Sequence, residues 1–173
     1  MIFVKERLEV IAAQLKKFRI PQSFQLDSWK VKEGFWLRPE EVDADPAPFT
    51  DFDSKLMHWY GPDRHYWFRT SFTVPESYDG KELWLYLRTQ IEEWDDAKNP
   101  QFLIFVNGEL KQGADMNHRE LLLSRCAKAG DQYTIDLQAY SGILHPEFRL
   151  LADVQELNPA VNALYYDIQV PLW

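Results

Sequence analysis

The sequence predicts a mainly β fold, a β-sandwich or jelly roll, with one helix near each end of the chain. Apolar and polar side chains alternate strictly along residues 66–74, as in a strand with one buried face. Asn107-Gly108 stands between two strand-like runs, and this pair favours a type I′ hairpin turn, in which both central residues need positive φ. Several short strands follow one another without helices between them, which is typical of a sandwich.

The first element is expected to be an amphipathic helix over residues 4–18, ended before Pro21. Its apolar stripe recurs at helical spacing, with charged residues opposite. The stripe consists of Val4, Leu8, Ile11, Leu15 and Phe18. We therefore divide the chain into a helix (1–20), a β-sandwich domain (21–157) and the start of a connecting helix (158–173).

Residues 38–53, RPEEVDADPAPFTDFD, contain three prolines and six acidic residues. This composition predicts a long surface loop. Long ordered loops in compact domains either serve a function or wrap the core, and we favour wrapping here.

The strands are expected near residues 64–74, 82–89, 102–106, 119–123, 132–140 and 147–156. In the second of these, Leu83, Leu85 and Leu87 point inward, and the alternate residues face the other way. The third, FLIFV, is apolar on both faces, as expected of a central strand. After it come the Asn107-Gly108 turn, a short return strand and a polar loop that ends in His118-Arg119-Glu120.

The tail predicts a second helix. Asn158 is a suitable N-cap and Pro159 suits the first turn, and apolar residues then recur at helical spacing. Because Pro171 and Trp173 follow almost at once, we expect this helix to lead into a further domain that this chain does not contain.

The composition of the chain limits its possible partners and its cellular location. The net charge of −8 argues against nucleic acid or an anionic membrane as a partner. The single cysteine, Cys126, excludes a disulfide scaffold and favours a reducing compartment. Charged residues interrupt the N-terminal apolar segment, and no apolar run reaches membrane-spanning length, so we expect a cytoplasmic protein.

The candidate chemistry is sparse. Four histidines are scattered without metal-ligand spacing, so we expect no metal site. There is no nucleophile elbow or glycine-rich phosphate loop, and no facing pair of carboxylates can be nominated. We assign no catalytic residue.

A binding role is more plausible for the polar loop, because sugar sites combine an aromatic platform with planar polar groups. Trp94 together with Asp115, Asn117, His118, Arg119 and Glu120 supplies these residue types for carbohydrate or interdomain contact. The alternative, which we favour, is purely structural. In it Arg119 and Glu120 form an ion pair at a strand start, and Trp94 packs over the sheet edge.

The polar loop also carries a family resemblance. Val106-Asn107-Gly108 is followed by Gly113, Asp115, Asn117, His118, Arg119, Glu120, Leu122 and Leu123. This pattern resembles the N-terminal β-domain of family 38 glycoside hydrolases, the α-mannosidases of the bacterial and yeast-vacuolar branch. The resemblance spans about residues 58–170. Residues 89–101 look longer than the family's usual link before the Val-Asn-Gly strand.

The resemblance implies a galactose-binding-like β-sandwich that precedes a catalytic domain. That domain would bind zinc and hydrolyse α-mannosides with retention, through an aspartate nucleophile. None of its motifs occurs here, so we expect a non-catalytic domain whose partner is its own downstream catalytic domain. Two alternatives remain open: a carbohydrate-binding module for mannosides, and an oligomerisation domain that uses residues 24–60 or the N-terminal helix to form a homo-oligomer.

Overall fold

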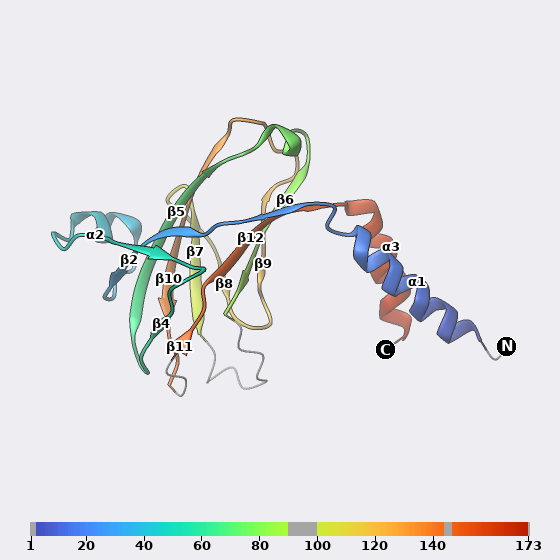
Figure 1. Ribbon diagram of the computed structural model, residues 1–173, viewed down its shortest axis with the longest axis horizontal. Coiled ribbons are helices and arrows are strands. Elements are labelled where there is room, and N and C mark those ends of the chain that lie inside the picture. The colour runs from blue at the N-terminus through green and yellow to red at the C-terminus, as the bar shows by residue number, and fades with distance from the viewer. Residues whose placement is uncertain (1–2, 90–99, 144–146, 173) are drawn as a thin grey trace.

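The computed structural model describes residues 3–89, 100–143 and 147–172, and it confirms a mainly β sandwich (Figure 1). A six-stranded sheet has the order β3-β2-β5-β10-β7-β8, and a four-stranded sheet has the order β1-β12-β6-β9. A short pair, β4 and β11, lies beside them. Every strand pairing is antiparallel.

The six-stranded sheet contains β3 (Thr50–Asp53), β2 (Ser28–Glu33), β5 (His65–Thr73), β10 (Gln132–Tyr140), β7 (Gln101–Val106) and β8 (Glu109–Ala114). The four-stranded sheet contains β1 (Ser23–Gln25), β12 (Leu151–Leu157), β6 (Glu82–Arg88) and β9 (Glu120–Ser124). The short pair is β4 (Trp59–Tyr60) and β11 (Glu147–Phe148). The helices are α1 (Val4–Phe18), α2 (Pro39–Ala44) and α3 (Pro159–Gln169), with 3-10 turns η1 (Glu76–Tyr78) and η2 (Val170–Leu172).

The main core lies between the two sheets. On β6 the predicted inward residues Leu83, Leu85 and Leu87 are buried. Facing them from β10 are the buried side chains of Ile135 and Leu137. The alternation read from the sequence therefore identified the core face of these strands correctly.

Strand β5 is buried on both faces, since Trp67 and Phe68 are each fully buried although they point to opposite sides of the sheet. Phe68 belongs to the main core. Trp67 belongs to a smaller second core, in which it packs with Val42 of α2 and Phe105 of β7. Helix α2 thus covers the outer face of the six-stranded sheet.

The prediction of a loop over residues 38–53 is wrong in part, because this segment contains α2 and β3. Pro39 begins the helix at a position where its missing N–H costs nothing, and Glu40 and Glu41 suit the positive end of the helix. The high content of acids and prolines concealed the two buried residues of the helix, Pro39 and Val42. The expected wrapping is correct, since Val42 packs on the sheet.

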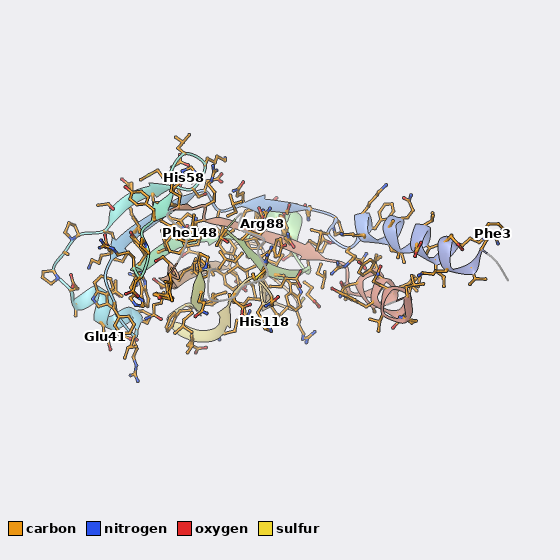
Figure 2. All side chains as sticks on the ribbon, turned by 90° about the horizontal axis from the view of Figure 1, so that it is seen from below. Phe3, Glu41, His58, Arg88, His118 and Phe148 are labelled. Atoms are coloured by element: carbon orange, nitrogen blue, oxygen red, sulfur yellow. The ribbon has the colours of Figure 1, made fainter. Side chains whose placement is uncertain are left out.

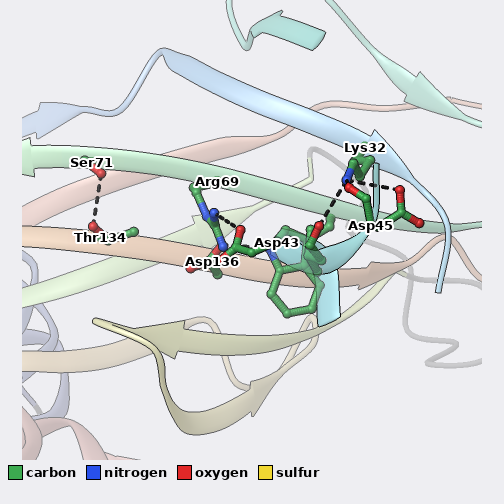
Figure 3. Close-up of polar contacts among 9 residues, drawn as sticks. Lys32, Asp43, Asp45, Arg69, Ser71, Thr134 and Asp136 are labelled. Carbon is green, nitrogen blue, oxygen red and sulfur yellow. Dashed lines mark hydrogen bonds and ion pairs between the residues drawn. The ribbon is translucent and has the colours of Figure 1, made fainter. Parts of the chain in front are cut away.

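Polar contacts anchor α2 on the sheet (Figure 3). The buried carboxylate of Asp136 accepts hydrogen bonds from Trp67 Nε1 at 2.7 Å and from Arg69 Nε at 2.6 Å. The guanidinium of Arg69 also donates to Asp43 of α2 at 2.6 Å. Buried Lys32 donates to the Val42 carbonyl at 3.0 Å, near the C-terminal end of the helix, where a positive charge is favourable.

The predicted hairpin is present. Asn107 and Gly108 both have positive φ, at 52° and 83°. The Asn107 side chain accepts a hydrogen bond from the backbone N–H of Thr134 at 2.8 Å, which ties the turn to β10. The predicted strand over 147–156 is broken instead into β11 and β12, because its first part pairs with β4 and its second part with β1 and β6.

Helices α1 and α3 pack side by side and extend beyond the sheets, on the side opposite α2 (Figure 1). We call this pair the helical arm. The predicted cap is confirmed, because the Asn158 side chain accepts a hydrogen bond from the Val161 N–H at 3.2 Å. Arg19 joins the two helices: its Nε donates to Asn162 Oδ1 at 2.7 Å, and its guanidinium lies 4.7 Å from the Tyr165 ring centre. None of the helices in the described part of the chain is long and apolar enough to cross a bilayer.

The buried Asp136 carboxylate gives a stability prediction. Asp136→Ala is expected to lower the free energy of unfolding by about 2–3 kcal/mol, because it leaves the Trp67 N–H without its acceptor inside the second core. Urea denaturation followed by tryptophan fluorescence measures this loss. Asp43→Ala removes the exposed carboxylate from the same arginine and is the matched control, with an expected cost below about 1 kcal/mol. Equal costs would contradict the role given to Asp136.

Candidate functional site

The polar loop, residues 115–119, connects β8 of one sheet to β9 of the other. One carboxylate oxygen, Asp115 Oδ1, organises it. This atom accepts the backbone N–H groups of Asn117 and His118, each at 2.8 Å, and lies 3.0 Å from His118 Nδ1. Aspartate often closes a turn in this way, by bonding to backbone groups two and three residues ahead.

The same contacts affect ionisation. Burial acts to raise the pKa of the Asp115 carboxyl, but the hydrogen bonds from the His118 and Asn117 backbone outweigh it, so the pKa lies below its usual value. Asp115 is therefore an ionised structural group within the loop, and its Oδ1 atom already accepts two backbone hydrogen bonds.

Arg119 completes the loop. Its Nε donates to the Met116 carbonyl at 2.6 Å, and its own carbonyl accepts the Leu87 N–H at 2.8 Å. Among the described residues no ion pair joins Arg119 to Glu120, so the ion pair that we considered at the strand start is replaced by this contact. The Glu120 carbonyl accepts Gln112 Nε2 at 2.9 Å, which fastens β9 to β8.

A groove of about 680 Å³ runs along one side of the loop. Its walls are two outward-facing aromatic residues of β6, the edge of β8, the loop and one tyrosine of α3. The lining residues are Trp84, Tyr86, Gln112, Gly113, Met116, Asn117, His118, Arg119, Glu120 and Tyr166. Trp84 Nε1 donates to Glu82 at 2.8 Å, and the Arg88 guanidinium lies 5.3 Å from the Tyr86 ring centre, so both rings are held in place.

A second groove of about 450 Å³ lies on the other side of the loop, over the outer face of β7, β8 and β10. Its lining includes His65, Gln101, Gln138 and Tyr140, and the His65 and Tyr140 rings pack 5.0 Å apart. His118 lines both grooves, and its side chain is 73% exposed. The loop is thus a ridge between two hollows.

The structure brings five of the six predicted site residues together in the loop or at the strand start after it: Asp115, Asn117, His118, Arg119 and Glu120. The sixth, Trp94, lies outside the described residues. Trp84 and Tyr86 were not nominated as site residues, although their alternation with buried leucines already placed them outward. Tyr166 could not be found from the sequence, because the position of α3 against the sheets has no local signal.

No three His, Cys, Asp or Glu side chains of the described ranges gather as metal ligands. In Figure 2, His58 and His118 lie at opposite edges of the sandwich. The described residues therefore offer no set of zinc ligands, and the zinc that the family resemblance implies belongs to the downstream catalytic domain of that family.

Comparison with known proteins finds no matching family model and no matching curated protein. Among solved structures the chain is similar to the β-glucuronidase of Ruminococcus gnavus, at 15% identity with a TM-score of 0.50. The similar region covers 79% of this chain and 28% of that one. The sandwich fold is shared with a glycoside hydrolase. A complex of the same enzyme with D-glucaro 1,5-lactone gives 15% identity, a TM-score of 0.49 and coverage of 79% and 29%. The chain thus spans less than a third of the length of these neighbours, and at this identity the likeness establishes the fold alone.

The low pKa of Asp115 predicts a pH dependence. A carboxyl whose pKa is lower in the folded than in the unfolded state stabilises the fold above the unfolded pKa, and this stabilisation is lost as the pH falls through the folded pKa. Asp115→Asn keeps an acceptor oxygen but does not titrate. The difference in unfolding free energy between wild type and Asp115→Asn should therefore be largest near pH 6 and shrink below about pH 4.

Urea denaturation at pH 6, 4 and 3 measures this difference. Glu120→Gln, which removes a neighbouring exposed carboxylate with no side-chain hydrogen bond among the described residues, controls for the change in net charge. A wild-type advantage over Asp115→Asn that stayed constant across this range would show that Asp115 does not act through its charge.

Proposed function

We propose that this chain is the non-catalytic N-terminal β-sandwich domain of an α-mannosidase-like glycoside hydrolase, with a structural and interdomain role. Two independent observations support this proposal. The pattern of residues 106–123 resembles the α-mannosidases of family 38, and the fold is shared with a β-glucuronidase, whose chain is much longer. Mannoside specificity rests on the sequence resemblance, since the structural neighbour is named for a different sugar.

The internal bonding of the loop carries the structural part of the proposal. Three donor groups converge on Asp115 Oδ1, and Arg119 Nε bonds to the Met116 carbonyl. These polar groups hold the loop in shape before any ligand binds. A preorganised ridge with a groove on each side suits a surface that contacts a neighbouring domain. Domain interfaces need shape complementarity, and a rigid surface loses less conformational entropy on association.

The helical arm fits the same role. Under this proposal residues 158–173 lead to the catalytic region, which would hold the zinc ion and the aspartate nucleophile. Tyr166 of α3 lines the groove beside the loop, so the connection would pass close to the ridge. The loop would then contact the catalytic region or frame the rim of its active site. A cytoplasmic location remains a prediction from the sequence.

The proposal predicts that the purified chain has no mannosidase activity on an aryl α-mannoside, with or without added zinc, because none of the catalytic motifs of the family occurs in its sequence. An α-mannosidase of known activity in the same assay confirms that the substrate and zinc conditions work. Measurable turnover that copurifies with the chain would overturn the non-catalytic assignment.

The groove favours a second candidate function, a carbohydrate-binding module for mannosides. Trp84 and Tyr86 offer aromatic surface, and Asn117, His118 and Arg119 offer planar polar groups beside it. A small number of placed polar groups on an aromatic wall is the usual composition of a small-molecule site.

Titration calorimetry with mannose oligosaccharides separates the two functions. The interdomain role predicts no saturable heat with the isolated chain. The binding-module role predicts saturable heat that Tyr86→Ala and Trp94→Ala each reduce at least about tenfold, the size expected for loss of one aromatic contact. Tyr60→Ala removes an exposed tyrosine that lines neither groove, and it serves as the control.

A further inference from the structure

The second groove is built from two rows of side chains on the outer face of the six-stranded sheet. In one row, Tyr140 of β10 lies between His65 of β5 and Gln101 of β7, its direct partners in the two strand pairings. In the next row, Gln138 of β10 lies opposite Leu103 of β7. Directly opposed residues of antiparallel strands point to the same face, with their Cβ atoms about 5 Å apart. Helix α2 covers the neighbouring part of this face, and these two rows remain open as the lining of the groove.

The aromatic side chains of the groove are fixed in position. The His65 ring contacts both the Phe35 ring, with ring centres 4.8 Å apart, and the Tyr140 ring, with ring centres 5.0 Å apart. The Tyr140 hydroxyl donates to Asp63 Oδ1 at 3.1 Å. These contacts hold the Tyr140 ring at the groove before any ligand binds. A tyrosine ring held in this way offers a surface on which a planar cation can stack.

The buried amide of Gln138 supplies an acceptor to the groove. This residue is only 9% exposed, and its Nε2 donates to the Trp36 carbonyl at 2.7 Å. Among the described residues no donor reaches the amide oxygen, Oε1. This oxygen is not one of the fully buried polar atoms, so it opens into the groove that Gln138 lines. A ligand that carries N–H groups can satisfy this acceptor.

The segment before α2 is shaped to hold this glutamine. Gly34 has a φ of +149°, and a Cβ at this position would lie 2.4 Å from the Trp36 ring. Only glycine therefore lets the Trp36 ring lie against residue 34 while the Trp36 carbonyl bonds to Gln138. The orientation of the Gln138 amide is thus built into the backbone of the neighbouring segment.

The charges around the groove select the charge of its ligand. None of the described residues that line it is a lysine or an arginine. Arg64, next to His65 in the chain, is already paired with Glu33 at 2.7 Å. Asp115 lines the groove as an ionised carboxylate whose Oδ1 is used by the loop, whereas no described residue donates to its Oδ2. The groove thus offers acceptors and a negative charge, in a chain of net charge −8, and suits a cation rich in donors.

We propose that the second groove receives an arginine side chain from the catalytic region that follows this chain. The guanidinium lies across β7, stacks on the Tyr140 ring, and donates to Gln138 Oε1 and Asp115 Oδ2. Arginine fits better than lysine, because a guanidinium is planar, carries five donors and stacks on aromatic rings, whereas an ammonium is a compact, strongly hydrated charge. This inference rests on the interdomain role proposed above and names the chemistry of the partner surface.

NMR titration of the ¹⁵N-labelled 173-residue chain at pH 7.5, where histidine side chains are ordinarily neutral, tests the proposal. The probe is N-acetyl-arginine amide. The matched probes are N-acetyl-citrulline amide, which has nearly the same shape without the charge, and N-acetyl-lysine amide, which carries the charge on an ammonium group. The arginine probe should shift the signals of Gln101, Gln138 and Tyr140 with a Kd on the order of millimolar, since one side chain makes few contacts. The other two should bind at least about fivefold more weakly.

Variants of the chain test the two acceptors. Asp115→Asn removes the charge but keeps an acceptor for the turn, and it should weaken binding of the arginine probe about fivefold. Glu120→Gln makes the same change in net charge directly after the loop, but it lines only the first groove and should leave the affinity unchanged. Gln138→Met, which is similar in size, removes the acceptor and should also weaken binding. The dispersion of each spectrum shows whether the variant is folded.

Equal binding of the arginine and citrulline probes, equal effects of Asp115→Asn and Glu120→Gln, or no shift with any probe would overturn the inference. Mannobiose that shifts the signals of this groove would make it a sugar site and would overturn the inference as well. Loss of the arginine preference leaves the non-catalytic assignment intact, because the mannosidase assay decides that assignment.

Discussion

The architecture depends on the burial of β5 and β10 on both faces. These strands form the centre of the six-stranded sheet and pair over nine residues, from Thr73 with Gln132 to His65 with Tyr140. One face meets the four-stranded sheet. The other would expose Trp67 and Phe105 if α2 did not cover it, and α2 is a six-residue helix with little stability of its own. The sheet therefore has to hold the helix in place, and the Asp136–Arg69–Asp43 and Lys32 contacts do so.

Polar contacts within the chain also determine the shape of the polar loop. A string such as Asp-x-Asn-His-Arg-Glu has the residue types of an active site, yet the Asp115 and Arg119 side chains form hydrogen bonds within the loop. Asp115 closes the turn, Arg119 binds the Met116 carbonyl, and the exposed His118 is left at the crest. Side chains with catalytic chemistry can thus serve to shape a surface, which makes the residue string a better sign of kinship than of reactivity.

Much of this structure was predictable, because several of its signals are local. The alternation along β6, the Asn107-Gly108 turn and the Asn158 cap each depend on a few neighbouring residues and the backbone geometry they prefer. Helix α2 was missed because only two of its residues, Pro39 and Val42, are buried within an acidic segment. The contribution of Tyr166 to the groove depends on how α3 is placed relative to β6 and β8, which no short pattern encodes. In α1 the helical spacing of the apolar residues was predicted correctly. This spacing alone does not show which of these residues the rest of the chain buries.

The order of the strands leaves β3 and β8 as the borders of the six-stranded sheet. Unpaired backbone groups at such borders invite strands of other molecules to add on, which is a route to amyloid-like aggregation. Here the borders carry Asp51 and Asp53 on one side, and Glu109 and Lys111 on the other, and the pairing of β7 with β8 is interrupted by an irregularity between Ile104 and Phe105. These charges and this distortion disfavour the addition of a strand from a neighbouring molecule at these two borders.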